Sequence, residues 1–168
     1  SGSCVSREDG GHSVPAGAAL PETGWAVGLE SVGPISFGMS LADAEAAAGA
    51  SLAGRPADAC AFVRLPGMPL GTQLMTERGR IVRADVTDGD TSTDRGARLG
   101  MTEEEVQALY DHTLEVRPHK YDSAGRYLVL VPDGAADSLR LVFETDGRAI
   151  TRFRAGILPA VEYVEGCG

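Results

Sequence analysis

The chain has 168 residues, 43 % of them hydrophobic, and a formal net charge of −9. This is enough to bury the core of one ordinary domain or of two small fused ones, which excludes a disordered acidic tail. Nucleic acid is excluded as a partner because binding a polyanion requires a basic face, and no apolar run approaches the roughly 18–20 residues that span a bilayer.

Residues 1–24 are mainly small, polar and proline residues, which predicts a flexible N-terminal tether. Cys4 lies in this segment. A cysteine between Ser-Gly-Ser and a linker resembles the anchor position of a bacterial lipoprotein, although the usual leucine three places earlier is missing. Three alternatives stay open: a lipid anchor, an ordinary cysteine of an exported protein, and a cloning remnant at residues 1–3.

The first helix is expected over residues 38–49, after a strand that begins near Trp25. Ser40 is a suitable N-cap, and Asp43 occupies the third helical position, where an acidic side chain can complete the cap. Gly49 predicts the C-terminal stop, because glycine adopts the left-handed conformation without steric penalty.

Two further elements complete a first unit over residues 25–87. Residues 61–66, AFVRLP, read as a strand that ends in proline. Residues 73–86 read as a hairpin that turns at Arg78-Gly79. We therefore expect one helix followed by an antiparallel meander.

Within residues 88–96, the stretch DGDTSTD at 88–94 resembles the beginning of a calcium loop because oxygen-bearing side chains alternate. These are Asp88, Asp90, Ser92 and Asp94. An EF-hand loop also requires glycine at its sixth position and glutamate at its twelfth, where this chain has Thr93 and Leu99. We therefore interpret the segment as an acidic linker and expect no metal, with calcium as the alternative.

The second helix is expected over residues 99–111, where LGMTEEEVQALYD repeats the phrase FGMSLADAEAAAG of residues 37–49. Thr102 and Glu105 have the spacing of a capping box, and Met101 can pack on Val106 as a hydrophobic staple.

The strand and hairpin recur after this helix. Residues 127–132, YLVLVP, predict a strand, and residues 140–156 predict a hairpin that turns at Asp146-Gly147, a dipeptide suited to a type I′ turn. Equivalent positions are separated by 62 residues at the helix, 66 at the strand and 68 at the turn glycine. This order predicts an α+β fold of two tandem helix-plus-antiparallel-meander repeats, residues 25–87 and 88–168, that share one core.

The repeated phrases Gly38-Met39-Ser40 and Gly100-Met101-Thr102, each followed by an acidic, alanine-rich helix and a meander, resemble the β-lactamase-inhibitor-protein-like fold. Small lipoproteins of outer-membrane protein assembly share that fold. The resemblance covers about residues 25–164 and implies a protein that binds other proteins. The matching residues cap helices, so the resemblance transfers no active-site residue.

The three cysteines are Cys4, Cys60 and Cys167. A Cys60–Cys167 disulfide would pin a chain end that would otherwise fray and would close a loop of about 108 residues. We predict this bond, and with it an oxidising, exported location: periplasmic, cell-surface or extracellular.

Catalytic motifs such as G-x-S-x-G, the P-loop, H-E-x-x-H and C-x-x-C do not occur. The most polar stretch is residues 116–127, which groups Arg117, His119, Lys120, Tyr121 and Asp122. One hypothesis makes His119 a general base oriented by Asp122. We favour a polar surface loop that takes part in binding, because neither a nucleophile nor a second carboxylate lies nearby in the sequence.

Five arginines fall on the predicted strands: Arg64, Arg83, Arg148, Arg152 and Arg154. Solubility does not explain them in an acidic chain, whereas arginine favours interfaces, where it pairs with carboxylates. We expect Arg152 and Arg154 to be exposed on one face and to bind a partner. The alternative is pairing within the chain, with Glu77, Asp85 or Glu144 on neighbouring strands.

The sequence thus predicts a monomeric, non-enzymatic module without a cofactor, exported or anchored at the bacterial cell envelope, that binds an unidentified protein. The expected binding residues are Arg117, His119, Lys120, Tyr121, Arg152 and Arg154. The membrane would be contacted only through a lipid on Cys4. The alternative function is small-ligand binding, or an enzyme that uses the His119 loop.

Overall fold

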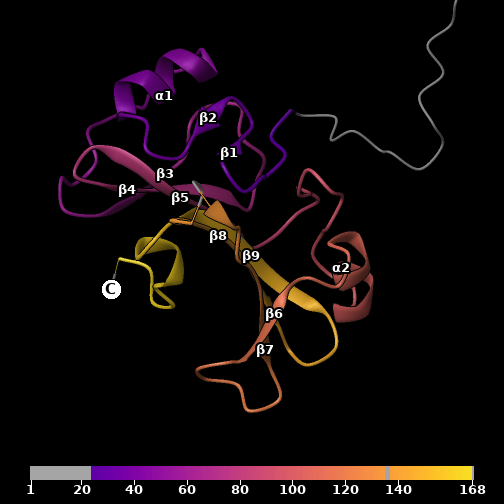
Figure 1. Cartoon of the computed structure of the whole chain (residues 1–168). Coiled ribbons are helices and arrows are strands. Elements are labelled where there is room, and N and C mark those ends of the chain that lie inside the picture. The colour runs from indigo at the N-terminus through magenta and orange to yellow at the C-terminus, as the bar shows by residue number, and fades with distance from the viewer. Residues whose placement is uncertain (1–23, 135–136, 168) are drawn as a thin grey trace, which may run out of the picture.

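The structure is a computed structural model that describes residues 24–134 and 137–167. Its main feature is a seven-stranded antiparallel sheet with the order β3-β4-β5-β9-β8-β7-β6 (Figure 1). The predicted α+β class is confirmed. Cys4 and residues 1–23 of the predicted tether lie outside the described residues.

The first half of the chain contributes β1 (Ser31–Val32), β2 (Ile35–Ser36), α1 (Leu41–Ala48), β3 (Ala61–Val63), β4 (Thr72–Glu77) and β5 (Arg80–Val86). The second half contributes α2 (Glu103–Leu109), β6 (Glu115–Pro118), β7 (Arg126–Leu130), β8 (Leu139–Thr145), β9 (Ile150–Ile157) and the short 3₁₀ helix η2 (Ala160–Glu162). β1 and β2 form a separate small ribbon.

Strands β5 and β9 meet at the centre of the sheet. Each is the second strand of a hairpin, and the two pair antiparallel with Asp85 opposite Arg154. From this pair outward, one half of the sheet runs β5, β4, β3 and the other runs β9, β8, β7, β6. Strands that follow one another in the chain are therefore neighbours out to both edges.

Equivalent backbone hydrogen bonds dock each helix on its own hairpin. The N–H of Gly38 donates to the carbonyl of Ile81 at 2.7 Å, and the N–H of Gly100 donates to the carbonyl of Ile150 at 2.9 Å. Both glycines have positive φ, +98° and +87°, a conformation that other residues rarely adopt. The glycine of the phrase that occurs twice is therefore required by the same docking geometry in both halves.

The predicted helix caps are confirmed. The Ser40 hydroxyl accepts from the N–H of Asp43 at 3.1 Å, and Gly49 ends α1 in the left-handed conformation. At α2, Thr102 accepts from the N–H of Glu105 at 3.1 Å, while the Glu105 carboxylate accepts from the N–H of Thr102 at 3.2 Å. Both orphan donors of this capping box are satisfied.

The main core lies between the helices and one face of the sheet. Ala44 of α1 and Val106 of α2 are fully buried there with Phe143 and Phe153, whose rings are 5.6 Å apart between centroids. Trp25 is also buried in this cluster, but the prediction of a strand beginning at Trp25 is wrong. The side chain packs as expected, while the backbone forms only an isolated bridge at Val27 before the β1–β2 ribbon.

The two hairpin turns differ. Arg78 and Gly79 both have positive φ, +51° and +75°, and form a two-residue turn. The type I′ prediction for Asp146-Gly147 is wrong, because the connection from β8 to β9 spans residues 146–149. The Asp146 carboxylate accepts from the N–H groups of Arg148 and Ala149, both at 2.9 Å, which stabilises this longer turn.

Residues 88–96, the predicted acidic linker, run partly through the interior. Residues 91–93 are buried, and Thr93 bridges to Val27 and accepts a hydrogen bond from the Tyr110 hydroxyl at 2.9 Å. The hydroxyl-bearing middle of the segment is therefore structural, while its aspartates face solvent. Within residues 24–134 and 137–167, no group of three or more His, Cys, Asp or Glu side chains could hold a metal ion.

Cys60 and Cys167 form the predicted disulfide, with their Cα atoms 5.6 Å apart and a sequence separation of 107. Such a bond is consistent with an oxidising environment. None of the described helices is long and apolar enough to cross a membrane.

Candidate functional site

The last described residues, 158–167, cross the face of the sheet that the helices leave uncovered (Figure 1). We call them the C-terminal segment. Val161 of η2 is fully buried against Val129 of β7 and Val142 of β8. At its far end Cys167 is bonded to Cys60, next to edge strand β3. The segment is therefore anchored both in the middle of the sheet and at one edge.

Two buried arginines hold this segment by its main-chain carbonyls. Arg83 on β5 donates to the carbonyls of Ala160 at 3.0 Å and Tyr163 at 2.6 Å. Arg154 on β9 donates from Nε to the carbonyl of Val161 at 2.5 Å. Both arginines are nearly inaccessible to solvent. Because the contacts are to carbonyls, they fix the path of the segment rather than a particular side chain.

A carboxylate on the same face neutralises each arginine. Arg83 makes a bidentate contact with Asp85, with both distances 2.8 Å, and Arg154 forms an ion pair with Glu144. Burial lowers the pKa of the Arg154 guanidinium from its ordinary value, and the nearby Glu144 carboxylate opposes that shift. Arg154 stays charged nonetheless, since arginine is not deprotonated in proteins.

The prediction that Arg154 is exposed is wrong, because the C-terminal segment covers its strand and leaves only 3 % of the residue accessible. The alternative is confirmed for two of the strand arginines: Arg83 pairs with Asp85 and Arg154 pairs with Glu144. Arg152, two residues earlier on β9, is exposed as predicted.

His119 follows β6, and its side chain is only 13 % exposed. Its Nδ1 accepts the backbone N–H groups of Tyr121 and Asp122, both at 3.1 Å. Nδ1 therefore carries no proton, which makes Nε2 the N–H that donates to Glu144 Oε1 at 2.9 Å. The Asp122 carboxylate does not orient the ring as hypothesised, since it accepts from the N–H of Ala124 instead.

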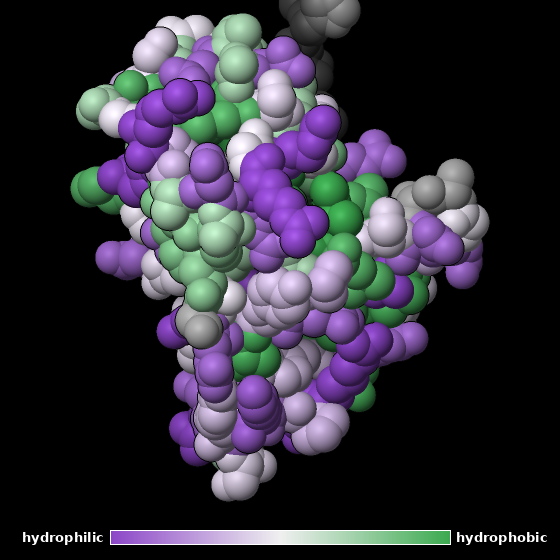
Figure 2. Space-filling view, turned by 90° about the vertical axis from the view of Figure 1, so that its left-hand side faces the viewer, coloured by the Kyte–Doolittle hydropathy of each residue, from purple (hydrophilic) through white to green (hydrophobic). Residues whose placement is uncertain are grey.

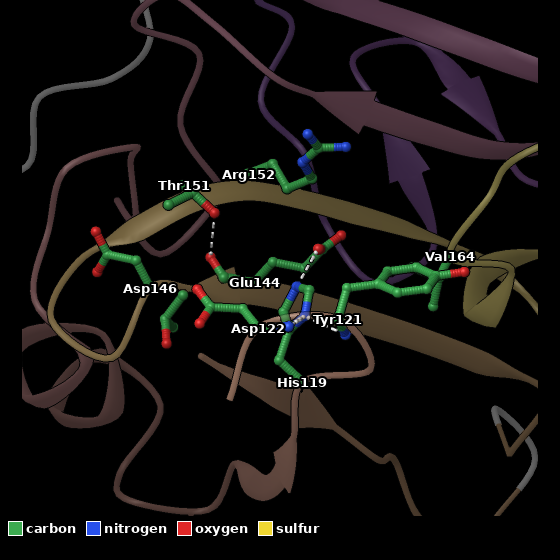
Figure 3. Close-up of a pocket in the computed structure, with 9 residues that line it drawn as sticks. His119, Tyr121, Asp122, Glu144, Asp146, Thr151, Arg152 and Val164 are labelled. Carbon is green, nitrogen blue, oxygen red and sulfur yellow. Dashed lines mark hydrogen bonds and ion pairs between the residues drawn. The ribbon is translucent and has the colours of Figure 1, made fainter. Parts of the chain in front are cut away.

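A shallow pocket of about 250 Å³ opens beside His119 (Figure 3). Its walls come from four segments of the chain. They are the loop after β6 with His119 and Tyr121, β8 with Glu144, β9 with Thr151 and Arg152, and the C-terminal segment with Val164. The Thr151 hydroxyl donates to the carbonyl of Glu144 at 3.2 Å, while the exposed Arg152 guanidinium in the same wall makes no ion pair among the described residues.

The remaining predicted residues flank the C-terminal segment. Arg117 is 2.8 Å from a carboxylate oxygen of Glu115 and 3.1 Å from one of Glu162, and these hydrogen bonds raise the pKa of Arg117, Glu115 having the larger effect. Lys120 lies 3.9 Å from the carboxylate of Glu165. The structure thus brings His119, Tyr121 and Arg152 into one pocket and places Arg117 and Lys120 beside the C-terminal segment.

Sequence reasoning missed the C-terminal segment itself, which organises the whole face. A signal for it was present in the predicted Cys60–Cys167 bond. That bond places the chain end beside β3, while β9 ends at Ile157 in the middle of the sheet. The residues between must therefore cross the sheet and cover whatever lies beneath.

Hydrophilic and apolar residues alternate over the side of the molecule on which the C-terminal segment lies (Figure 2). Three aromatic side chains of the described residues are exposed: Phe62, Tyr121 and Tyr163. No protein-family model, no curated protein and no solved structure matches the chain.

Proposed function

We propose that the chain is a non-enzymatic protein-binding module whose binding surface surrounds the C-terminal segment. The observation that carries the proposal is the distribution of the exposed aromatic side chains. Phe62 lies against Gly166, Tyr121 donates its hydroxyl hydrogen to Glu165, and Tyr163 belongs to the segment. Aromatic side chains are enriched in protein interfaces and among the residues that contribute most to binding.

This surface is also held in place before binding. The disulfide fixes one end of the C-terminal segment, and Arg83 and Arg154 hold its carbonyls. A preorganised surface loses less conformational entropy on association than a mobile one. Arg152, which makes no ion pair within the described parts of the chain, supplies an exposed cation at its border.

The state of His119 supports a binding role over catalysis. A general base requires a free nitrogen lone pair within reach of a substrate proton. In His119 two backbone N–H groups occupy Nδ1, and Nε2 points at Glu144. Small-ligand binding or catalysis in the adjoining shallow pocket is therefore the second candidate.

The same proposal includes the origin and location of the module. We interpret the matched helix docking in the two sheet halves as a tandem repeat and keep the β-lactamase-inhibitor-protein-like fold as the architecture it resembles. The disulfide supports export, with Cys4 as a candidate lipid anchor at a bacterial envelope. The module acts as a monomer on a protein partner.

The test is capture from an envelope extract by the full chain, compared with the variants Tyr163→Ala, Arg152→Glu and Val116→Ala. Val116 is 54 % exposed but lies on edge strand β6 and serves as the control. We expect one captured protein to be lost with the first two variants and retained with the third. Equal capture by all variants would contradict the proposal, and turnover of a small molecule that His119→Gln abolishes would favour the second candidate.

A further inference from the structure

A second candidate surface lies in the loop between β3 and β4. Leu70 in this loop is 79 % exposed, more than any other large hydrophobic side chain of the described residues. A single exposed leucine on a mobile loop would carry no argument. What distinguishes Leu70 is that the chain holds its loop in one conformation.

Arg64, an exposed residue at the start of this loop, holds the loop by hydrogen bonds to its main chain. Its guanidinium donates to the carbonyl of Thr72 at 3.1 Å and to those of Met68 and Pro69, both at 2.9 Å. Three carbonyls on both sides of Leu70 are thus satisfied by one side chain. The loop has the rigidity that lowers the entropy loss on binding.

The loop is also fixed by its packing on the core and on residues 88–89. Leu65 and Met68 are buried, so the loop has its own apolar attachment to the core. Gly71 and Gly89 leave no room for a side chain: a Cβ on Gly71 would lie 2.3 Å from the carbonyl oxygen of Asp88, and one on Gly89 would lie 2.9 Å from that of Leu70. The loop therefore packs directly on residues 88–89 and presents Leu70 outward.

The charged side chains near Leu70 indicate what kind of partner surface Leu70 contacts. Arg64 in the loop is exposed, but its guanidinium donates to three loop carbonyls, whereas Asp88 and Asp90 beside the loop are exposed and form no ion pair among the described residues. Carboxylates beside an apolar side chain are repelled by the anionic surface of a membrane and attracted by lysine or arginine. The combination of a rigid apolar projection and an acidic border fits an apolar pocket with a basic rim.

We propose that Leu70 is a docking residue that inserts into an apolar pocket of a protein partner, with Asp88 and Asp90 opposite basic residues at the rim of that pocket. Different residues carry this surface and the surface around the C-terminal segment, so the two proposals can fail separately. Arg64 acts here as a positioning residue that does not itself touch the partner.

The experiment uses the full chain with a photoreactive benzoylphenylalanine in place of Leu70, irradiated in envelope extract. A chain with the same group in place of Ala47, which is exposed on α1, is the control. A protein crosslinked only from position 70 is then purified, and its affinity is measured for the wild type and for Leu70→Ala, Val116→Ala, Arg64→Ala and Asp88→Asn/Asp90→Asn.

We expect Leu70→Ala to weaken binding by roughly tenfold or more, the range of an interface residue that dominates affinity, and Val116→Ala to leave it unchanged. Asp88→Asn/Asp90→Asn should weaken binding less and reduce its salt dependence. Arg64→Ala should weaken binding although Leu70 is intact.

Three results would overturn the proposal. They are no crosslink above the Ala47 control, equal affinities of Leu70→Ala and Val116→Ala for the crosslinked protein, and Leu70-dependent binding to vesicles of phosphatidylcholine and phosphatidylglycerol, which would assign Leu70 to a membrane. Tyr163→Ala, measured in parallel, shows whether the surface around the C-terminal segment binds independently of this outcome.

Discussion

The two faces of the central sheet are buried in different ways. On the helix side, Phe143 and Phe153 pack with apolar side chains of both helices. On the other side, Arg83, Asp85, Glu144 and Arg154 are nearly as deeply buried, yet they form ion pairs beneath the C-terminal segment. The stability of the first face depends on complementary packing and on buried apolar area. The stability of the second face depends on each buried charge having its partner.

The difference has an energetic consequence. An apolar core loses stability roughly in proportion to the atoms removed, but a buried ion pair that loses one partner leaves an uncompensated charge. The ion-paired face is therefore stable only while the C-terminal segment and all four charged side chains stay in place. The same ion-paired side chains hold the C-terminal segment in one conformation.

The largest expected effect follows from breaking the ion-paired face. Arg154→Ala leaves Glu144 buried without its cation and frees the carbonyl of Val161, and should reduce the free energy of unfolding by about 3–5 kcal/mol. Arg152→Ala, two residues away on the same strand but exposed, should change it by less than about 0.5 kcal/mol. Urea unfolding of both variants measures the difference, and equal values would show that the ion pair does not support this face.

The same contrast explains which parts of the molecule the sequence could predict. The helix caps at Ser40 and Thr102 and the Cys60–Cys167 bond depend on local spacing or on few residues, and they were predictable. The exposure of Arg154 was not, because it depends on a segment that crosses the sheet after β9 ends. Alternation along a strand assigns a side chain to a face but does not say what covers that face.

The His119 pocket shows the same limit. Residues 116–127 were recognisable as a polar stretch, yet the partner of His119 is Glu144, 25 positions further on. The sequence also suggested Asp122 as the group that orients the ring, and it is the backbone N–H of Asp122 that does so. The sequence does not tell whether the side chain or the backbone of a neighbouring residue makes a contact, because that depends on the conformation of the folded loop.

The second prediction concerns the one aromatic hydroxyl buried on the helix side in the described chain. Tyr110 is 2 % exposed, and burial raises its pKa to about 12. An unfolded tyrosine titrates near 10, so above that pH the unfolded state loses its proton first. The contribution of the protonated Tyr110 to the free energy of unfolding is therefore fully present below about pH 10. It is lost as the pH rises through 12, which lowers the free energy of unfolding by about 2–3 kcal/mol.

Unfolding free energies of the wild type and Tyr110→Phe, measured between pH 8 and 12, check this expectation. Phenylalanine removes the titration together with the hydrogen bond to Thr93, so the variant should be less stable at pH 8 by about 1 kcal/mol and should then lose less stability above pH 10. If the free energies of unfolding of the two proteins change in parallel with pH, the pKa of the Tyr110 hydroxyl does not differ between the folded and unfolded states.

The smallest predicted effect compares the two helices, whose caps differ although their docking is matched. Thr102→Ala removes the acceptor for the N–H of Glu105 and leaves the returning Glu105 carboxylate without the ordered cap, and should cost about 1 kcal/mol. Ser40→Ala removes a single hydrogen bond, to Asp43, and should cost less than Thr102→Ala. Thr102→Ser and Ser40→Thr keep the hydroxyl and are the matched controls. If both alanine variants lose equal stability, the second hydrogen bond of the capping box adds nothing to the stability of the protein.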